Sequence, residues 1–504
     1  MTAPGGASGS AGRRATSFGR SGPGHRATDA SRARRPLVVV GDALADRDVD
    51  GVVERICPDA PVPVVSVRDG RLRPGGAALA ALVAARTGDR PVRLVTALGG
   101  DDAGHAVVAL LRDAGVDVVD LGLAGPTPQK VRVRSAGQSL VRLDVGDPPA
   151  PCSEGDRLEE TVLAGAGAVL VADYGRGLAS SARVRPALEA AAAGGATLVW
   201  DPHVRGGEPV PGCRLVTPNR VEAEHFAGPV TGDGLAATTA RAAALRQRWS
   251  AHAVAVTLGA SGALLFDGSG TPLVVPATAV DGDPCGAGDS FSAAAALALA
   301  GGALPSEAVA EAVRFAGHFV ASGGAGALGA PGEPVVHLAL GPDAAPGTAA
   351  TPPTSRTSRT SRMTAPVRPT TVATGGCFDV LHAGHVATLT AARALGDRLV
   401  VLINSDRSVH RRKGPGRPRQ SERDRATVLH ALACVDDVVV FDEDLPLTAL
   451  DRLRPDVWVK GGDYTLDGLP EADLVASWGG QVVIVPYLEG RSTTRIISED
   501  LRAR

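Results

Sequence analysis

The chain has 504 residues, of which 44% are hydrophobic and 21% charged, with a formal net charge of −2. This length exceeds what a single core supports, so two or three domains are expected, and the lack of a basic excess argues against nucleic acid as the main partner. No apolar run reaches the roughly 18 residues that span a bilayer. Six scattered cysteines without a CxxC pair fit reduced thiols in a cytoplasmic enzyme better than disulfides or zinc.

The first 35 residues are rich in Gly, Ser, Ala and Arg and lack the apolar stretch of a secretory signal. We expect residues 1–35 to be a disordered N-terminal tail. An organelle transit peptide is the alternative interpretation.

Residues 36–340 alternate between β-rich apolar runs and Ala/Leu-rich stretches, which predicts βαβ units around a largely parallel sheet. Two segments depart from this pattern, Val62–Val67 and Lys130–Asp144. Their polar and apolar residues alternate, which predicts a small half-buried antiparallel flap beside the main sheet.

Rare residue types mark candidate chemical groups. Lysine occurs only at positions 130, 413 and 460, and asparagine only at 219 and 404. Arginine carries nearly all other positive charge but does not replace a compact ammonium at a phosphate. We therefore treat these five residues as candidate site residues.

The segment Asp283–Asp289 reads DPCGAGD and precedes an Ala/Leu-rich stretch that predicts a helix. Gly286, Ala287 and Gly288 would open this helix, so several backbone N–H groups and the positive end of the helix dipole would meet there. Such a turn can stabilise the charge of a transferring phosphoryl group, with Asp289 placed to accept a proton from a hydroxyl. An acidic helix cap on a glycine-rich turn is the alternative.

This segment belongs to an ordered set of motifs that resembles the ribokinase family of sugar kinases. The others are GG at 75–76, GGDDAG at 99–104, TPNRVE at 217–222 and TLGASG at 257–262. The resemblance implies that Asp289 is the catalytic base and that Gly286, Ala287 and Gly288 form the anion hole. It also implies an ATP and Mg²⁺ site that includes Asn219, Glu222, Thr257, Gly259 and Gly262.

Within that family the chain is most similar to heptose 7-phosphate kinases, through RICPDAPVPVV at 55–65, TPQKVR at 127–132 and DYGRG at 173–177. A phosphorylated sugar needs cations nearby. The implied sugar-phosphate residues are Asp42, Gly75, Gly76, Lys130, Arg132, Arg142 and Arg176, although the arginines could equally form a solvated strand face. Close relatives carry Asn where this chain has Leu79, which leaves the accepted sugar open.

Residues 341–369 contain a repeated Thr-Ser-Arg and no apolar periodicity, which predicts a flexible linker that fixes no relative domain geometry. Residues 370–504 begin with a strand, a glycine-rich turn and a helix. In TGGCFDVLHAGH at 374–385, His382 and His385 flank Gly384 at the helix start, so both imidazoles can donate to one phosphoryl centre. A zinc site or a purely structural histidine pair is the less favoured alternative.

This second region resembles the HxGH nucleotidyltransferases of the cytidylyltransferase-like group, and its KGGDY and STTRII segments resemble heptose 1-phosphate adenylyltransferases. The resemblance implies that His382 and His385 are catalytic and that no general base is required. We expect no metal site here, because no further ligands with zinc spacing accompany the two histidines. The implied nucleotide and phosphate residues are Thr374, Gly375, Phe378, Gly384, Asn404, Asp406, Lys413, Arg425, Lys460, Asp463, Ser492, Thr493 and Thr494.

The expected fold is α/β throughout, a ribokinase-like α/β/α domain with a β flap linked to a Rossmann-like nucleotidyltransferase domain. The two resemblances together imply a bifunctional enzyme of ADP-heptose biosynthesis that uses ATP and heptose phosphates, without membrane or nucleic-acid partners, as a homo-oligomer, most simply a dimer. Two alternatives stay open: a kinase–cytidylyltransferase pair for another sugar or polyol phosphate, and a non-catalytic sugar-phosphate sensor fused to an active transferase.

Overall fold

The computed structural model describes residues 35–87, 90–136, 138–146, 152, 154–230, 234–328, 369–461 and 469–486. Residues 1–34 of the expected tail and 341–368 of the expected linker lie outside these ranges. Four predicted site residues also lie outside them: Asp463, Ser492, Thr493 and Thr494. In the ranges that are described, no helix has both the length and the apolar character needed to cross a membrane.

The first domain is built on a sheet whose central strands are apolar runs buried on both faces, as expected of parallel strands covered by helices. The strand order is β13-β12-β11-β10-β9-β8-β1-β4-β5, parallel except where β12 joins its two neighbours. The strands are β1 (Leu37–Gly41), β4 (Val92–Thr96), β5 (Val116–Asp120), β8 (Ala168–Ala172), β9 (Leu198–Asp201), β10 (Leu215–Val216), β11 (Val254–Thr257), β12 (Ala263–Phe266) and β13 (Leu273–Val275).

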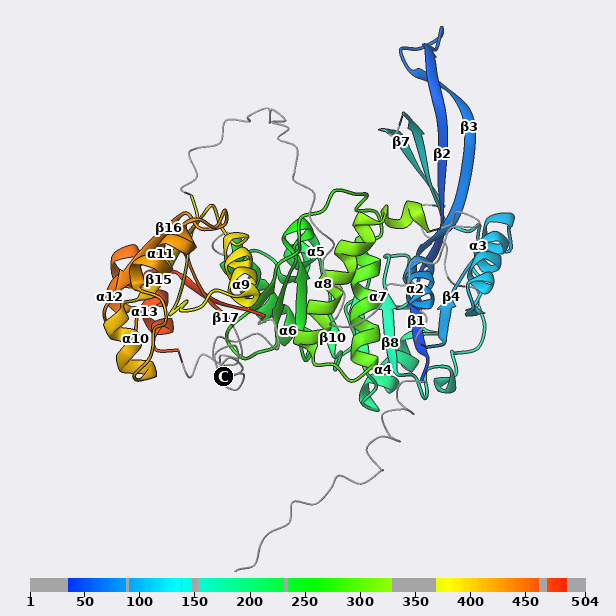
Figure 1. Ribbon diagram of the computed structural model, residues 1–504. Coiled ribbons are helices and arrows are strands. Elements are labelled where there is room, and N and C mark those ends of the chain that lie inside the picture. Colours follow the sequence, from blue (N-terminus) through cyan, green and yellow to red (C-terminus); the bar gives the residue numbers. More distant parts are fainter. Residues whose placement is uncertain are drawn as a thin grey trace, which may run out of the picture.

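Helices cover both faces of this sheet, and alternate residues of β1 show the two layers. Leu37 and Val39 belong to one core cluster, and Val38 and Val40 to another. The first face packs against α2 (Ala77–Arg86), α3 (Asp102–Asp113), α7 (Ala287–Ala300) and α8 (Pro305–Ala321); the second packs against α4 (Arg185–Ala193), α5 (Arg220–Ala227) and α6 (Gly234–Arg248). The predicted α/β/α arrangement is therefore present (Figure 1).

The predicted flap is a second, four-stranded sheet in the order β3-β2-β6-β7. Its strands are β2 (Ala43–Ile56), β3 (Pro63–Gly76), β6 (Gln129–Ser135) and β7 (Gln138–Val145). The β2/β3 and β6/β7 pairs are antiparallel, as expected, but β2 and β6 are parallel. Figure 1 shows β2 and β3 extending well beyond the body of the domain.

The second domain contains a parallel sheet in the order β16-β15-β14-β17-β18, again covered on both faces. Its strands are β14 (Thr371–Gly376), β15 (Arg398–Asn404), β16 (Asp437–Phe441), β17 (Val457–Gly461) and β18 (Gln481–Val485). Its helices are α9 (Ala383–Arg393), α10 (Asp406–Lys413), α11 (Glu422–His430), α12 (Leu447–Leu453) and α13 (Glu471–Ser477).

The two sheets meet edge to edge where β18 lies parallel to β13, with Leu273 and Ile484 as the paired residues. The Ile484 N–H donates to the Pro272 carbonyl at 3.3 Å, and the Gln481 amide donates to the Thr239 hydroxyl at 2.6 Å. A flexible linker alone would leave the two domains without a defined contact. The contact seen here is made by residues of the two domains themselves.

Candidate active sites

In the first domain, two cavities meet at the N-terminal end of α7. One has a volume of about 210 Å³ and is lined by Asp173, Asp201, Asn219, Glu222 and Asp289 among others. The other, of about 390 Å³, is lined mainly by apolar residues together with Thr257, Gly259 and Gly262. Both include Thr257, Ala287 and Gly288 in their walls. A polar and an apolar compartment thus share the turn that the sequence marks as an anion hole.

The chain reaches α7 through Gly286, which has a left-handed φ of +81°. A Cβ at this position would lie 2.8 Å from the Leu79 side chain, so both conformation and space favour glycine. Asp289 follows in the first helical turn and is only 7% exposed. Burial raises the pKa of Asp289 to about 7, against the lowering effects of a hydrogen bond from Tyr174 and the charge of Lys130. A carboxyl with this pKa is suited to proton transfer near neutral pH.

Leu79 lies beneath the anion-hole turn. Its side chain is 2% exposed and faces Gly286, and it is not among the residues that line either cavity. Replacing the relatives' Asn by Leu at this position therefore changes the packing under the turn rather than the wall of the cavity.

Asn219 and Glu222 form a reciprocal capping box at the start of α5. The Asn219 amide oxygen accepts from the Glu222 backbone N–H at 3.0 Å, and the Glu222 carboxylate accepts from the Asn219 N–H at 2.8 Å. Burial raises the pKa values of Glu222 and Asp173 to about 7 and also raises that of Asp201. Several carboxyl groups thus gather in one polar compartment.

The predicted cations of the flap have different partners. Lys130 on β6 lies over the Tyr174 ring, 5.0 Å from its centroid, and so faces the catalytic end of the cavity. Arg132 donates to Asp46 at 3.0 Å, and Arg142 pairs with Asp144 at 2.8 Å on the exposed outer strand.

The remaining sugar-side residues shape the backbone. The Asp42 carboxylate accepts the backbone N–H groups of Tyr174, Arg176 and Leu178 at 3.2, 2.9 and 3.1 Å, which holds the loop after β8. The Arg176 guanidinium donates to the Gly146 carbonyl. Gly75 and Gly76 end β3. A Cβ on Gly75 would lie 2.5 Å from the Leu44 side chain, and a Cβ on Gly76 would lie 2.5 Å from the Asp42 carbonyl oxygen.

In the second domain, β14 leads into a turn that brings His382 and His385 together. The rings are stacked, with centroids 3.8 Å apart and an interplanar angle of 23°. His382 is the N-cap of α9 and His385 lies in its first turn. Burial, followed by the charges of His382 and Lys413, lowers the pKa of His385 to about 4, so the ring is neutral at pH 7. A neutral imidazole still offers one N–H to a phosphoryl oxygen.

The residues before the histidine pair form a tightly packed floor. The Thr374 hydroxyl donates to the Val459 carbonyl at 2.9 Å, and a Cβ on Gly375 would lie 2.6 Å from the Trp458 ring. Phe378 has a φ of +46°, and its ring centroid lies 5.1 Å from that of His385. Gly384 is buried in the first turn of α9.

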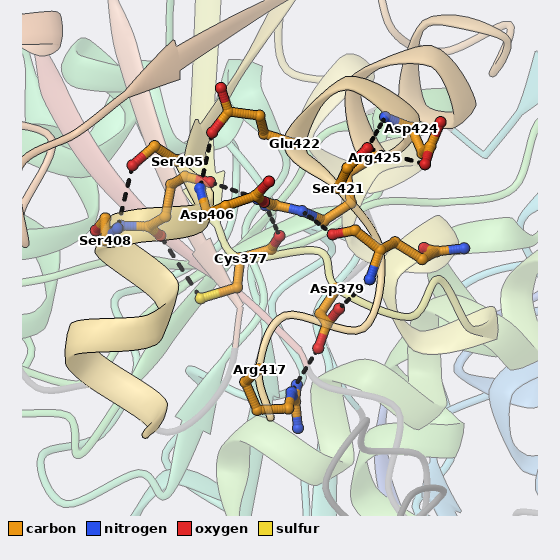
Figure 2. Close-up of polar contacts among 12 residues, drawn as sticks. Cys377, Asp379, Ser405, Asp406, Ser408, Arg417, Ser421, Glu422, Asp424 and Arg425 are labelled. Atoms are coloured by element: carbon orange, nitrogen blue, oxygen red, sulfur yellow. Dashed lines mark hydrogen bonds and ion pairs between the residues drawn. The ribbon is translucent and has the colours of Figure 1, made fainter. Parts of the chain in front are cut away.

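Arg425 lies on α11 and is enclosed by protein groups. Its guanidinium is fully buried and donates to the carbonyls of Cys377 at 2.6 Å and Asn404 at 2.9 Å, and to the Asp406 carboxylate at 2.8 Å (Figure 2). The Asn404 amide in turn donates to the Ser408 hydroxyl at 2.9 Å. In this arrangement Arg425 ties together the carboxyl ends of β14 and β15, and the phosphate-binding role expected for it stays a prediction.

The two lysines of this domain are placed differently. Lys413 ends α10 and is close enough to His385 to lower its pKa. Lys460 follows in β17 and forms an ion pair with the buried Glu471 at 2.9 Å, with its ammonium 5.2 Å from the centroid of the Trp458 ring.

Comparisons with known proteins match both domains. The pfkB family of carbohydrate kinases matches residues 34–331, and the cytidylyltransferase-like family matches residues 373–503. The bifunctional protein HldE of Streptomyces coelicolor is 51% identical over 477 residues, covering 92% of this chain and 96% of that protein. The chain belongs to the HldE family.

Another HldE protein, from Caulobacter vibrioides, is 38% identical and covers 92% of this chain and 97% of its own. Among solved structures, Arabidopsis thaliana ribokinase complexed with ribose and ATP is 25% identical with a TM-score of 0.45, covering 57% of this chain and 93% of that chain. Membership in the HldE family confirms the predicted family and fold class, and it makes the chain a bifunctional enzyme that pairs a sugar kinase with a nucleotidyltransferase.

Three residues at these HldE-type sites were not predicted from sequence. Tyr174 donates its hydroxyl to Asp289 at 2.5 Å, and Asp201 ends β9 in the polar cavity. Asp379, buried within the histidine motif, accepts from the Arg417 side chain (Figure 2). It also accepts from the backbone N–H groups of Arg419 and Gln420. Asp201 could have been found, because polar residues at the carboxyl ends of parallel strands commonly face ligands.

Proposed function

We propose that this chain carries out two ATP-dependent steps of ADP-heptose formation. The first site phosphorylates D-glycero-β-D-manno-heptose 7-phosphate at O1. The second joins D-glycero-β-D-manno-heptose 1-phosphate to AMP from ATP and releases pyrophosphate. The observation that carries this proposal is the junction of two cavities at Gly286–Asp289, together with the stacked His382–His385 pair.

In the kinase reaction, the Asp289 carboxylate accepts the proton of the sugar O1 hydroxyl as that oxygen attacks the γ-phosphorus of ATP. The backbone N–H groups at the start of α7 stabilise the charge on the transferring phosphoryl group. The apolar 390 Å³ cavity suits the nucleoside, whereas the polar cavity suits the sugar end. Lys130 supplies positive charge on the sugar side.

The kinase site also fits Mg²⁺ that arrives with ATP. Mg²⁺ prefers oxygen ligands and is commonly held by one or two carboxylates plus substrate phosphates. Glu222 and Asp201 line the polar cavity, and burial keeps the pKa of each above its ordinary value. Within the described ranges no three His, Cys, Asp or Glu residues are grouped to hold a metal by themselves. When bound, the cation would neutralise phosphate charge.

In the transferase reaction the nucleophile is a sugar phosphate, which is already anionic and needs no general base. Catalysis then consists of positioning and charge stabilisation during in-line attack on the α-phosphorus. His382 and His385 face that phosphorus as N–H donors. Lys413 and Lys460, two of the three lysines in the chain, supply charge to the phosphates.

The two reactions do not share an intermediate directly, because a separate phosphatase must remove the 7-phosphate between them. The setting we infer is the cytoplasm, since the six cysteines are all free thiols.

We also infer a homodimer through the flap, because Ile56, Val62 and Val67 near its tip are at least half exposed. Analytical ultracentrifugation of the wild-type chain and of Ile56→Asp would test the dimer: the variant should sediment as a monomer, and a monomeric wild type would contradict it.

Coupled assays of the full-length chain test the proposal. With ATP and the heptose 7-phosphate we expect ADP and a 1,7-bisphosphate, and with the heptose 1-phosphate we expect pyrophosphate from ATP. Pyrophosphate release with CTP but not ATP would favour the kinase–cytidylyltransferase alternative. A lack of ATP turnover with every sugar 7-phosphate, while the transferase stays active, would favour the sensor alternative.

A further inference from the structure

Tyr174 links the flap to the catalytic base of the kinase site. It follows β8 in a loop that Asp42 holds through three backbone N–H groups, and the Gly175 N–H donates to Asp173 at 2.7 Å within the same loop. The tyrosine hydroxyl lies 2.5 Å from Oδ1 of Asp289. Its position is therefore fixed by the backbone and not only by the contact with Asp289.

The Tyr174 ring has one cationic and one aromatic neighbour. The Lys130 ammonium, on flap strand β6, lies 5.0 Å from the ring centroid, and the His203 ring stacks on it at a centroid distance of 6.5 Å. A cation over an aromatic face is attracted to it, so the flap lysine helps to orient the ring. The sequence carries only three lysines, and this one points at the residue that contacts the base.

We propose that Tyr174 is a positioning residue for phosphoryl transfer, in which its hydroxyl donates to Oδ1 of Asp289 and directs Oδ2 to the attacking hydroxyl of the sugar. The proton of that hydroxyl passes to Asp289 as the new O–P bond forms and the bond between the γ-phosphorus and ADP breaks. This inference rests on the proposed kinase reaction and concerns only how its base is held in the ionised, correctly turned state.

The charges around Asp289 explain why such a donor is needed. Burial, together with the charge of Asp46 on β2, raises the pKa of Asp289 to about 7. Asp201 at the end of β9 interacts electrostatically with both Glu222 on α5 and Asp289, and these charges raise the pKa of Asp201 after burial does. The Tyr174 hydroxyl and then Lys130 are the side chains that lower the pKa of the base, and a backbone N–H adds to their effect. Without the hydroxyl, Asp289 would keep its proton to a higher pH.

The test is Tyr174→Phe in the full-length chain, because phenylalanine keeps the ring and its contact with Lys130. We expect kcat/KM of the kinase for the sugar phosphate to fall by about tenfold at pH 7 and to recover toward the wild-type value near pH 9, because the ionised Asp289 carboxylate loses a hydrogen-bond donor. The acid limb of the profile should therefore move to higher pH, with little change in the KM for ATP.

Two comparisons separate this role from a structural one. Adenylyl transfer by the same sample reports on folding and should be unchanged, and Asp289→Asn should be inactive as a kinase at every pH. A Tyr174→Phe enzyme with the wild-type pH profile, or with the same fractional loss at every pH, would overturn the inference. A faster variant would also overturn it, by showing that the hydroxyl competes with the substrate. If the wild-type chain is inactive with every sugar phosphate, the proposed kinase reaction itself fails, which is a distinguishable result.

Discussion

Arg425→Met should destabilise the transferase domain rather than weaken its affinity for phosphate. The Arg425 side chain is 0% exposed and donates to the backbone carbonyls of Cys377, Asn404 and Gln420 and to the Asp406 carboxylate. A buried acceptor that loses its donor costs about 1–3 kcal/mol. Three carbonyls lose a donor at once, whereas the Asp406 carboxylate is 42% exposed, so water can replace its partner and this contact adds little. These costs overlap, so we expect a loss of about 3–5 kcal/mol, a large part of the roughly 5–15 kcal/mol that stabilises a domain.

The matched control lies two residues away on the same helix. Arg423 is exposed on α11, so Arg423→Met should change stability by less than about 0.5 kcal/mol. Arg425→Lys is the informative conservative variant, because one ammonium cannot reproduce the planar fork that serves several acceptors at once. It should retain the charge and still lose most of the stabilisation.

Thermal inactivation of both activities in one sample measures the effect. In the Arg425 variants the adenylyltransferase should inactivate at a lower temperature than in wild type, whereas the kinase should be unaffected. A variant with wild-type stability but a raised KM for ATP in the transferase reaction would refute this reasoning and return Arg425 to the phosphate-binding role expected from sequence.

Three further outcomes follow from the geometry. Asp289→Asn should abolish kinase turnover while sugar binding, measured by calorimetry, and adenylyl transfer persist; residual turnover above about 1% would argue against a base role. Gly286→Ala places a Cβ 2.8 Å from Leu79 at a φ of +81°, so kinase activity should drop at least about tenfold, and an active variant would show that the turn can shift. Because the pKa of His385 is lowered to about 4, the unfolded chain takes up a proton between pH 6.5 and 4 that the folded chain does not. Transferase stability should therefore fall on the order of 2 kcal/mol as the pH drops through this window, and His385→Gln should flatten that dependence in unfolding experiments.

Local sequence patterns predicted those parts of the sites that depend on neighbours along the chain. A Gly-Ala-Gly-Asp run before an apolar helix determines where backbone N–H groups and a carboxylate must lie, and Gly286 and Asp289 occur there. The stacked histidines follow from the same kind of reasoning, since a spacing of three at a helix start places two rings on one side.

Contacts between distant segments could not be predicted in this way. Tyr174 and Asp289 are 115 residues apart in sequence, and nothing in the DYGRG segment indicates which carboxylate its hydroxyl will meet. For Arg425 the residue type predicted a phosphate ligand, whereas its burial depends on how β14, β15 and α11 pack together and could not be predicted. A single sequence specifies charge and not the depth at which that charge lies.

The separation of the two sets of catalytic groups suggests why one chain can hold two separable enzymes. β13 and β18 pair at a single residue position, and each described catalytic group is surrounded by residues of its own domain. The kinase base is held by β8 and the flap, whereas the histidine pair is held by β14 and α9. Because no described catalytic residue of one site contacts the other, a substitution at either site should leave the other reaction intact. The same separation suits a route in which a phosphatase acts between the two steps, since the product of the first site must leave the enzyme before the second can use it.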